Sequence, residues 1–394
     1  MNPSSLKNRH VLLAVTGGIA VYKAAELIRR LRSEEAEVTV VMTESSQRFI
    51  TPLTFESLSG NKVYTDIFSV PMAHITLPES ADLFVIAPAT ANIIGKLASG
   101  IADDMVALSF LAFRGPVIFA PAMNWRMYEH PVLQRNIKTL RDLGCQEVEP
   151  EEGELACGEY GVGRMAEAGR IIEAVKGCLT KKDLAGLKVL VVAGPTREYI
   201  DPVRFISNRS SGKMGYALAG VALRRGADVT LVSGPVSVEP PLGARVVRVE
   251  TSDEMLEAVK KNLGGVDVLV MAAAVADFVP DDYSPVKREK EGGFTLKLRP
   301  SPDIVKAVSG IRKRPFIVGF SAETGPNIAK AKKKLGEKGM DFIVFNDVTL
   351  EGAGFDTDTN KISVIDEDGV ADYPLMSKEG CAEIIFDHYL RHSR

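Results

Sequence analysis

The sequence of 394 residues contains no long apolar run and no excess of charge of one sign. Its apolar stretches, such as residues 11–15, are far shorter than the ~20 residues that a membrane span requires. Its 48 Lys and Arg residues face 51 Asp and Glu residues, so the net charge is -3. This balance provides no basic field for a phosphate backbone and disfavours a general nucleic-acid binder. Because the N-terminus also lacks a signal-peptide pattern, we expect a cytoplasmic protein that contacts neither membrane nor nucleic acid.

Cysteine is scarce as well. The four cysteines, Cys145, Cys157, Cys178 and Cys381, are widely scattered and form no C-x-x-C pair. Neither a disulfide framework nor a cysteine-based zinc site is therefore indicated, and any special cysteine acts as a reactive thiol. With 45% hydrophobic and 25% charged residues the chain is not disordered, and its length predicts two or three domains.

Short apolar strands alternate with helical stretches along the whole chain, and most strands run into a turn rich in Gly, Pro or Thr. Residues 11–15, for example, form a continuous apolar run that ends at Thr16. Ala24, Leu27 and Leu31 follow at the spacing of one helix face. This alternation predicts an α/β fold of two doubly wound, Rossmann-like parallel sheets with helices on both faces.

The expected elements can be given by residue range. In the first half the strands are 11–15, 37–42, 83–87 and 117–120, and the helices are 91–99, 131–143 and 169–179. In the second half the strands are 188–193, 228–232, 245–249, 266–271, 316–320 and 341–345, with an edge hairpin at 361–373. Thr251 and Glu254 predict a capping box, and Pro302 and Pro326 are each expected at a first helical position.

A polar segment, residues 180–186, separates the two halves and ends in glycine. Directly after it, residues 188–193 restart an apolar run into a Gly-Pro-Thr turn. We therefore expect one domain over residues 1–183 and a second over residues 184–394.

Candidate ligand sites lie after the strands, because a doubly wound sheet binds its ligand beyond the carboxyl ends of its strands. Residues 16–20, Thr-Gly-Gly-Ile-Ala, suit backbone amides that approach a phosphate, but a plain tight turn explains them equally well. Residues 87–92 and 120–127 each bring small residues and an asparagine to a strand end, where a flat ring and a carboxylate fit. Strand-end turns with Asx caps are the alternative.

Two side chains of the first half are candidates for proton transfer. His74 falls in a loop expected before strand 83–87, and a lone loop histidine is more often an ordinary surface residue. Cys157 lies within residues 153–165, whose four glycines indicate a mobile flap that carries the thiol to a ligand. Cys145 and Cys178 lie in or beside helices, and we expect them in the core.

The second half contains a candidate anion site. Residues 208–215 bring Asn, Arg, Ser, Gly and Lys to a helix start, which suits anionic groups or an ordinary capped helix. Asp277 ends a buried strand, a position from which Mg²⁺ that bridges phosphates is often held. Lys287, Lys334 and Lys338 are candidates to neutralise phosphate, although lysines four residues apart on a helix usually form a solvated face.

These motifs resemble a known family over nearly the whole chain. Pro88 to Ile93 resembles the P-A-S-A-N-T motif of flavin-dependent cysteine decarboxylases, with Thr90 in place of the serine and Ile93 in place of the last threonine. Residues 121–127 match P-x-M-N-x-x-M, and residues 156–165 match the family's substrate flap. The second half resembles phosphopantothenate–cysteine ligases over residues 193–215, 272–277, 287–290, 302–304 and 319–324. The chain thus resembles the bifunctional family of coenzyme A biosynthesis in which a phosphopantothenoylcysteine decarboxylase is joined to that ligase.

For the first half, the resemblance implies a flavodoxin-like domain that binds FMN. His74 would be the base that helps the flavin oxidise the cysteinyl end, and Asn124 would bind the carboxylate that leaves. Cys157 would protonate the resulting enethiol as it is reduced to 4'-phosphopantetheine. The residues implied to bind FMN are Gly17, Gly18, Ile19, Thr43, Pro88, Thr90 and Asn92.

For the second half, the resemblance implies that the carboxylate of 4'-phosphopantothenate attacks CTP, giving an acyl-nucleotide and pyrophosphate. Cysteine would then displace the nucleotide. Arg204 and Asn208 would bind the acyl intermediate, Asp277 would hold Mg²⁺, and Lys287 would contact the phosphates, in a motif less basic than is common in bacteria. The other residues implied to surround the nucleotide are Met271, Ala272, Ala273, Pro302, Asp303, Ile304, Val305, Phe320, Lys334 and Lys338.

The resemblance also implies a homo-oligomer built on trimers, because the flavin sites of this family form between subunits. Two other functions are alternatives. A regulatory flavoprotein that binds a partner protein is disfavoured by the intact His74, Asn124 and Cys157 and by the complete ligase half. A nicotinamide dehydrogenase is disfavoured because neither half has G-x-G-x-x-G after its first strand.

Overall fold

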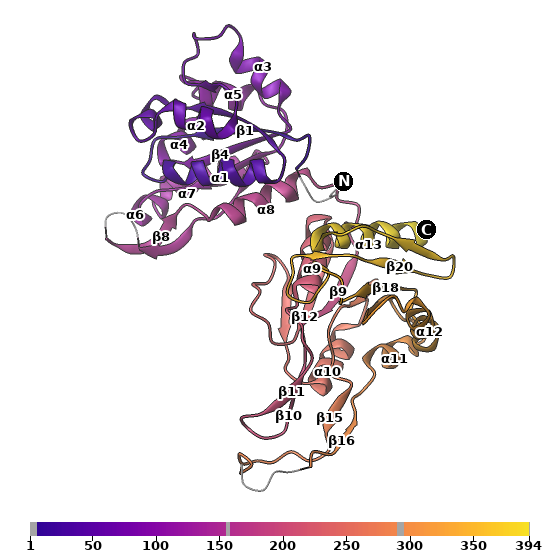
Figure 1. The fold of residues 1–394 in the computed structure, drawn as a ribbon. Helices are drawn as coiled ribbons and strands as arrows, with labels where there is room; N and C mark the ends of the chain where they lie inside the picture. Colours follow the sequence, from indigo (N-terminus) through magenta and orange to yellow (C-terminus); the bar gives the residue numbers. More distant parts are fainter. Residues whose placement is uncertain (1–5, 155–157, 290–294, 394) are drawn as a thin grey trace. The chain divides into compact units, whose positions relative to one another are not determined.

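The computed structural model describes residues 6–154, 158–289 and 295–393. The chain divides into two compact units, the first ending at Thr180 and the second beginning at Lys181 (Figure 1). No helix in the described part of the chain is long and apolar enough to cross a membrane.

The first unit is built on a six-stranded parallel sheet in the order β3-β2-β1-β4-β5-β6. Its strands are β1 (His10–Val15), β2 (Glu37–Met42), β3 (Val63–Tyr64), β4 (Leu83–Ala89), β5 (Val117–Pro121) and β6 (Gln146–Glu147). Apart from the two-residue edge strand β3, this is the strand order of flavodoxin-like sheets. The expected fold class is confirmed, and each of the four expected strands is present within two residues of its predicted ends.

Helices cover both faces of this sheet. They are α1 (Val21–Ser33), η1 (Glu44–Arg48), α2 (Pro52–Ser59), α3 (Ala73–Ser80), α4 (Ala91–Ser99), α5 (Met105–Ala112), α6 (Trp125–Tyr128), α7 (Pro131–Asp142) and α8 (Ala168–Leu179). Alternate residues of β1 belong to two separate cores: Val11 and Leu13 pack with α1, α2 and α8, whereas Leu12 and Ala14 pack with α3, α4, α5 and α7. Burial on both faces explains why β1 appears in the sequence as an unbroken apolar run.

The second unit has an eight-stranded sheet in the order β13-β12-β9-β14-β17-β18-β20-β21. Its strands are β9 (Lys188–Ala193), β12 (Asp228–Ser233), β13 (Arg245–Arg248), β14 (Val268–Met271), β17 (Phe316–Glu323), β18 (Phe342–Asp347), β20 (Ser363–Ile365) and β21 (Val370–Asp372). The pairs up to β18 are parallel, and β20 and β21 add an antiparallel hairpin at the edge. The predicted edge hairpin is thus confirmed.

The helices of the second unit are α9 (Lys213–Arg224), α10 (Ser252–Asn262), α11 (Ile304–Ser309), α12 (Ile328–Lys338) and α13 (Lys378–His392). The predicted capping box at Thr251 and Glu254 is present. The predicted helix starts at Pro302 and Pro326 are wrong. α11 and α12 begin two residues later, because the side chains of Asp303 and Asn327 accept the N–H groups of Lys306 and Lys330 and so cap the helices.

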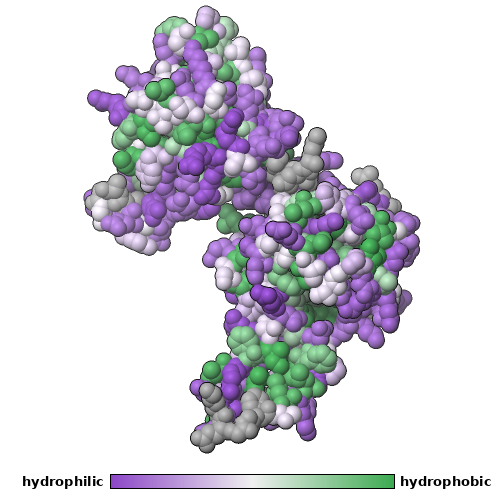
Figure 2. Space-filling view, in the orientation of Figure 1, coloured by the Kyte–Doolittle hydropathy of each residue, from purple (hydrophilic) through white to green (hydrophobic). Residues whose placement is uncertain are grey.

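Two hairpins that the sequence did not predict form an arm beside the sheet (Figure 1). They are β10 (Arg197–Tyr199) with β11 (Phe205–Ser207), and β15 (Phe278–Pro280) with β16 (Leu298–Pro300), and β10 contacts β15. Apolar side chains gather over the arm in Figure 2. Exposed Phe205, Phe278 and Leu298 lie on its strands, and exposed Val203 lies in the turn between β10 and β11. The smaller elements are the hairpin β7 (Glu151–Glu154) with β8 (Tyr160–Arg164) in the first unit and the pair β19 (Thr359–Asn360) with β22 (Met376–Ser377) in the second.

The domain boundary stays a prediction, and cutting the chain tests it. We expect the piece that starts at Lys181 to fold alone, because Leu184 is fully buried and Asp183 makes a two-point ion pair with Arg225. A piece that starts at Lys188 should fold but be less stable by about 3 kcal/mol, since it loses both contacts. Circular dichroism and urea unfolding of the two pieces measure this. An unfolded spectrum for the longer piece would contradict the boundary.

Candidate functional site

The turns after β1 and β4 meet at the carboxyl edge of the first sheet, where the strand order reverses. The buried hydroxyl of Thr16 donates to the carbonyl oxygen of Pro88 at 2.7 Å and lies 3.2 Å from the hydroxyl oxygen of Thr90. The backbone N–H of Thr90 donates back to the Thr16 hydroxyl at 3.1 Å. Two motifs more than seventy residues apart in sequence are therefore joined directly.

Glycine is required in the turn after β1. A Cβ on Gly17 would lie 2.2 Å from the Oγ atom of Ser45 and 2.5 Å from its Cβ, and a Cβ on Gly18 would lie 3.3 Å from Cγ2 of Thr90. Ser45 in turn lies 3.2 Å from the hydroxyl of Thr43, measured between the two side-chain oxygens. The structure thus brings together the predicted residues Gly17, Gly18, Thr43, Pro88 and Thr90.

The carboxyl edge of the first sheet has the properties of a site that binds an anion and a flat ring. Among the described residues no side chain caps α1 and none in its first turn is acidic. The N–H groups of Val21 and Lys23 donate to the carbonyl oxygens of Gly18 and Ala20, and the partial positive charge of the helix N-terminus suits a phosphate. Ile19, just before this helix, is 61% exposed, and Asn92 is exposed in the first turn of α4. A close glycine turn, an uncapped helix and two threonine hydroxyls fit the phosphate and polyol of a flavin nucleotide.

His74 lies on α3, so its predicted loop position is wrong. α3 begins directly after Met72, whose positive φ of 60° turns the chain into the helix. His74 is half-buried, and its buried Nδ1 atom has no hydrogen-bond partner among the described residues. A buried ring nitrogen without a hydrogen-bond partner is unusual in a protein and favours an acid or base role for His74 over an ordinary surface role.

Asn124 caps α6, and its amide binds a carboxylate. Its Oδ1 atom accepts the N–H of Arg126 at 2.9 Å, and its Nδ2 atom donates to Oε2 of Glu159 at 3.1 Å. Trp125 donates to the same Glu159 oxygen at 3.0 Å, and Arg126 pairs with the other oxygen at 2.6 Å. We did not predict Glu159. Its only sequence signal is an acidic residue two positions after Cys157.

The predicted substrate flap lies against this asparagine. A Cβ on Gly163 in β8 would lie 2.1 Å from the carbonyl oxygen of Met123, and the N–H of Met123 donates to the Gly163 carbonyl. Cys157 itself lies outside the described residues. Of the two cysteines expected in the core, Cys145 is buried, whereas Cys178 is only half-buried and donates to Gln146.

The second unit has a cavity of about 620 Å³, bounded by the turns after its central strands. It is lined by the predicted residues Asn208, Met271, Ala272, Ala273, Asp277, Pro302, Asp303, Ile304, Val305, Phe320, Lys334 and Lys338. Segments from five separate parts of the chain therefore converge on one cavity.

Anion-binding and cation-binding groups share this cavity. α9 has no side-chain cap among the described residues and begins directly after Gly212, whose φ is 74°. The Asn208 amide donates to the carbonyl oxygen of Val275 at 2.8 Å. The expected position of Asp277 at the end of a buried strand is wrong, because β14 ends at Met271 and Asp277 lies directly before β15. Its carboxylate is exposed and makes no hydrogen bond or ion pair with any described residue. A hard oxygen ligand of this kind fits Mg²⁺.

The lysines of α12 are paired with carboxylates at the cavity wall. Lys334 donates to one oxygen of Glu323 at 2.9 Å, and Lys330 donates to the other at 2.6 Å. Burial alone would raise the pKa of Glu323, but these two hydrogen bonds lower it to about 2. Lys338 lies 3.0 Å from a carboxylate oxygen of Asp303. Lys334 and Lys338 thus line the cavity and do not form only a solvated helix face.

Two predicted residues lie outside the described cavity wall. Arg204 belongs to the arm, where it donates to buried Asp201 at 2.9 Å. Burial would raise the pKa of Asp201, but backbone N–H groups, together with the charge of Arg204, lower it to about 2. Lys287 is exposed on the segment after β15, and the last residue of its 287–290 motif lies outside the described residues.

One lysine of the cavity was missed. Lys378, the first residue of α13, is buried and lines the cavity, and its ammonium group donates to the carbonyl oxygens of Gly354 and Phe355. Burial and the nearby charge of Lys213 lower the pKa of Lys378. No motif marks it, because its place depends on a helix at the far end of the chain.

Comparison with known proteins identifies the family. A flavoprotein family model matches residues 1–180, and a model described as the DNA/pantothenate metabolism flavoprotein C-terminal domain matches residues 184–392. The chain is 48% identical over 383 residues to the coenzyme A biosynthesis bifunctional protein CoaBC of Bacillus subtilis (strain 168), covering 95% of this chain and 94% of the relative. It is 41% identical over 393 residues to that of Escherichia coli (strain K12), covering 97% of each. The chain belongs to this family.

Two solved structures each resemble one part of the chain. The C-terminal domain of a CoaBC protein is 39% identical and covers 53% of this chain and 96% of its own, with a TM-score of 0.46. The FMN-dependent cysteine decarboxylase SpaF is 31% identical and covers 44% of this chain and 97% of its own, with a TM-score of 0.40. The family membership stated above rests on the full-length relatives.

Replacing Gly17 tests the cofactor edge. Gly17→Ala should lower stability by about 2 kcal/mol and reduce the amount of bound flavin, because the new methyl group meets the side chain of Ser45 and also its backbone carbon at 2.8 Å. Urea unfolding and the flavin absorbance per chain measure both effects. Gly169→Ala is the matched control, since its nearest neighbour, an Arg30 nitrogen, is 3.5 Å away. Full flavin content in Gly17→Ala would show that this turn is not part of the site.

Proposed function

We propose that the second unit joins 4'-phosphopantothenate to cysteine with CTP, and that the first unit decarboxylates the product to 4'-phosphopantetheine with FMN. The family membership supports a bifunctional enzyme of coenzyme A biosynthesis. The observation that carries the assignment is the convergence of each half's motifs on one edge of its own sheet. The product of the reaction in the second unit is the substrate of the reaction in the first unit.

In the first unit, the chain would hold FMN at the carboxyl edge of the sheet. The N-terminus of α1 with Gly17 and Gly18 would bind the phosphate, and Thr43 and Thr90 would bind the polyol. The other residues assigned to FMN binding are Ile19, Pro88 and Asn92. When bound, FMN supplies the reversible two-electron chemistry that makes the loss of carbon dioxide easy.

Three side chains would handle the substrate of the first unit. His74 would take a proton on its unpartnered Nδ1 atom. The amide of Asn124 would hold the departing carboxylate, as it holds the carboxylate of Glu159 in the structure. Cys157, assigned by resemblance, would deliver a proton to the enethiol.

In the second unit, the carboxylate of 4'-phosphopantothenate would displace pyrophosphate from CTP, and the amine of cysteine would then displace CMP. Asp277 would hold the Mg²⁺ that screens the phosphate charge, and Lys334 and Lys338 would contact the nucleotide. Asn208 would bind the acyl-nucleotide, and its position on the cavity wall supports this role. Arg204 and Lys287 are assigned by resemblance alone.

We further propose a cytoplasmic homo-oligomer built on trimers. Ile19 and Tyr22 beside the cofactor edge are each 61% exposed, which supports coverage of this edge by a flavin or by a second copy of the chain.

Cys157→Ser tests the first reaction. A serine hydroxyl keeps the size of the side chain but is a far weaker acid than a thiol, whose pKa is ~8.5. Carbon dioxide should still be released, about one equivalent per site, whereas the rate of 4'-phosphopantetheine formation should fall at least 100-fold. Mass spectrometry should detect the enethiol, which lacks two hydrogens relative to the product. Cys178→Ser is the control, and normal turnover in Cys157→Ser would remove the assigned role.

Asn208→Ala tests the second reaction. The variant should still release pyrophosphate from CTP in the presence of 4'-phosphopantothenate, but the coupling to cysteine should slow at least tenfold, because the acyl-nucleotide is held less well. A pyrophosphate assay and a coupled product assay separate the two steps. Asn262→Ala, at the end of α10 and outside the cavity wall, is the matched control. Equal loss of both steps would point to nucleotide binding instead.

A further inference from the structure

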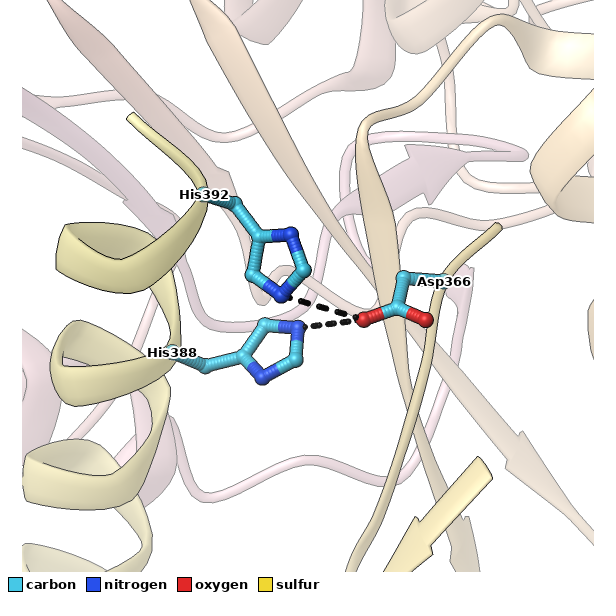
Figure 3. A group of neighbouring side chains, drawn as sticks. All are labelled: Asp366, His388 and His392. Atoms are coloured by element: carbon cyan, nitrogen blue, oxygen red, sulfur yellow. Dashed lines mark ion pairs between the residues drawn. The ribbon is translucent and has the colours of Figure 1, made fainter. Parts of the chain in front are cut away.

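Two histidines and a carboxylate meet at the C-terminal end of α13, as Figure 3 shows. His388 and His392 are one turn apart on this helix and point to the same side, toward Asp366 in the turn between β20 and β21. The Nε2 atom of His388 lies 2.8 Å from Oδ2 of Asp366, and that of His392 lies 3.4 Å from the same oxygen. One ligand atom from each of the three side chains lies within 4.8 Å of the others.

The centre of this cluster is buried and incompletely satisfied. His388 is 6% exposed, and its Nε2 atom has no hydrogen bond of good geometry among the described residues, although Asp366 is close. The second carboxylate oxygen of Asp366 accepts the N–H groups of Asp368 and Gly369, each at 2.9 Å. The turn therefore fixes the carboxylate so that Oδ2 faces the two imidazole rings.

We propose that Asp366, His388 and His392 bind one divalent transition-metal ion of the Zn²⁺ class. Two imidazole nitrogens and one carboxylate oxygen form a donor set that Zn²⁺ prefers over Mg²⁺, and two histidines at i, i+4 present their nitrogens to a single ion. With three protein ligands, water completes the coordination. Glu367 and Asp368 in the same turn add negative charge that favours a cation.

This site is separate from the proposed Mg²⁺ position. None of its three residues lines the described cavity, and the donors at Asp277 are oxygens only. The metal would link the last turns of α13 to the edge hairpin, whereas Lys378 at the start of α13 lines the cavity. The role of the metal ion is therefore to fasten α13 to the sheet, and not to take part in either reaction.

The experiment uses the untagged full chain after treatment with a chelator. Isothermal titration with Zn²⁺ alone should find one site per chain that is lost, or weakened at least tenfold, in His392→Gln and in Asp366→Asn. Excess Zn²⁺ should raise the thermal midpoint of the wild-type second-unit transition, and not that of either variant. His392 is in the last turn of the helix, so this variant is expected to fold.

The controls are His130→Asn, a histidine in the first unit, and Asp368→Asn, an exposed carboxylate in the same turn. His130→Asn should bind Zn²⁺ as the wild type does, and Asp368→Asn should weaken binding less than tenfold, because it removes a nearby charge but no ligand. Equal Zn²⁺ stoichiometry and affinity in the wild type, His392→Gln and Asp366→Asn would overturn the proposal. No Zn²⁺ binding by the wild type would also overturn it and would leave a direct His–Asp contact as the only function of the cluster.

Discussion

Helices cover both faces of each sheet, so the carboxyl ends of the parallel strands are where the backbone can reach a ligand. Residues 11–15 of β1 and 190–193 of β9 are fully buried, and neither strand carries a polar side chain along those stretches. The first polar groups after them are the buried hydroxyls of Thr16 and Thr196. Thr16 ties its turn to the turn after β4, and Thr196 accepts the N–H of Ala276 after β14. In both units, a buried threonine hydroxyl after the first strand thus connects two of the turns at the carboxyl ends of the strands.

The sequence predicted the central strands well because burial on both faces leaves an unambiguous apolar signature. Strands 37–42 and 188–193 were predicted to the residue. The arm was missed because its strands β10, β11, β15 and β16 have only three residues each and are partly exposed, too short for an apolar pattern to stand out. Their pairing depends on contacts such as that of Asp201 with the N–H of Arg288, and local patterns carry no information on a partner 87 residues away.

The residues of the candidate sites also fall into those that the sequence could predict and those that it could not. Residues that follow a strand end closely, such as Thr90 and Asn124, could be found because the motif and the strand end nearly coincide, whereas Asp277 was found by its motif although β14 ends earlier, at Met271. Glu159 and Lys378 could not, since each takes its place only when a distant hairpin or helix packs against the motif. The helix spacing of His388 and His392 is visible in the sequence, but Asp366 comes from another element and reaches them through the tertiary fold.

Both sites share one electrostatic feature. The side chains assigned to anionic ligands are already paired with carboxylates of the chain: Asn124 with Glu159, Lys334 with Glu323 and Lys338 with Asp303. When an anion binds, the lysine or asparagine exchanges a carboxylate of the chain for that anion. The electrostatic free energy of binding is therefore the difference between two similar interactions. Pairing also lowers the cost of holding lysines together when no ligand is bound, and it prevents a general attraction for phosphate. Selectivity in both sites must therefore come from the shape of the glycine turns and cavity walls more than from charge.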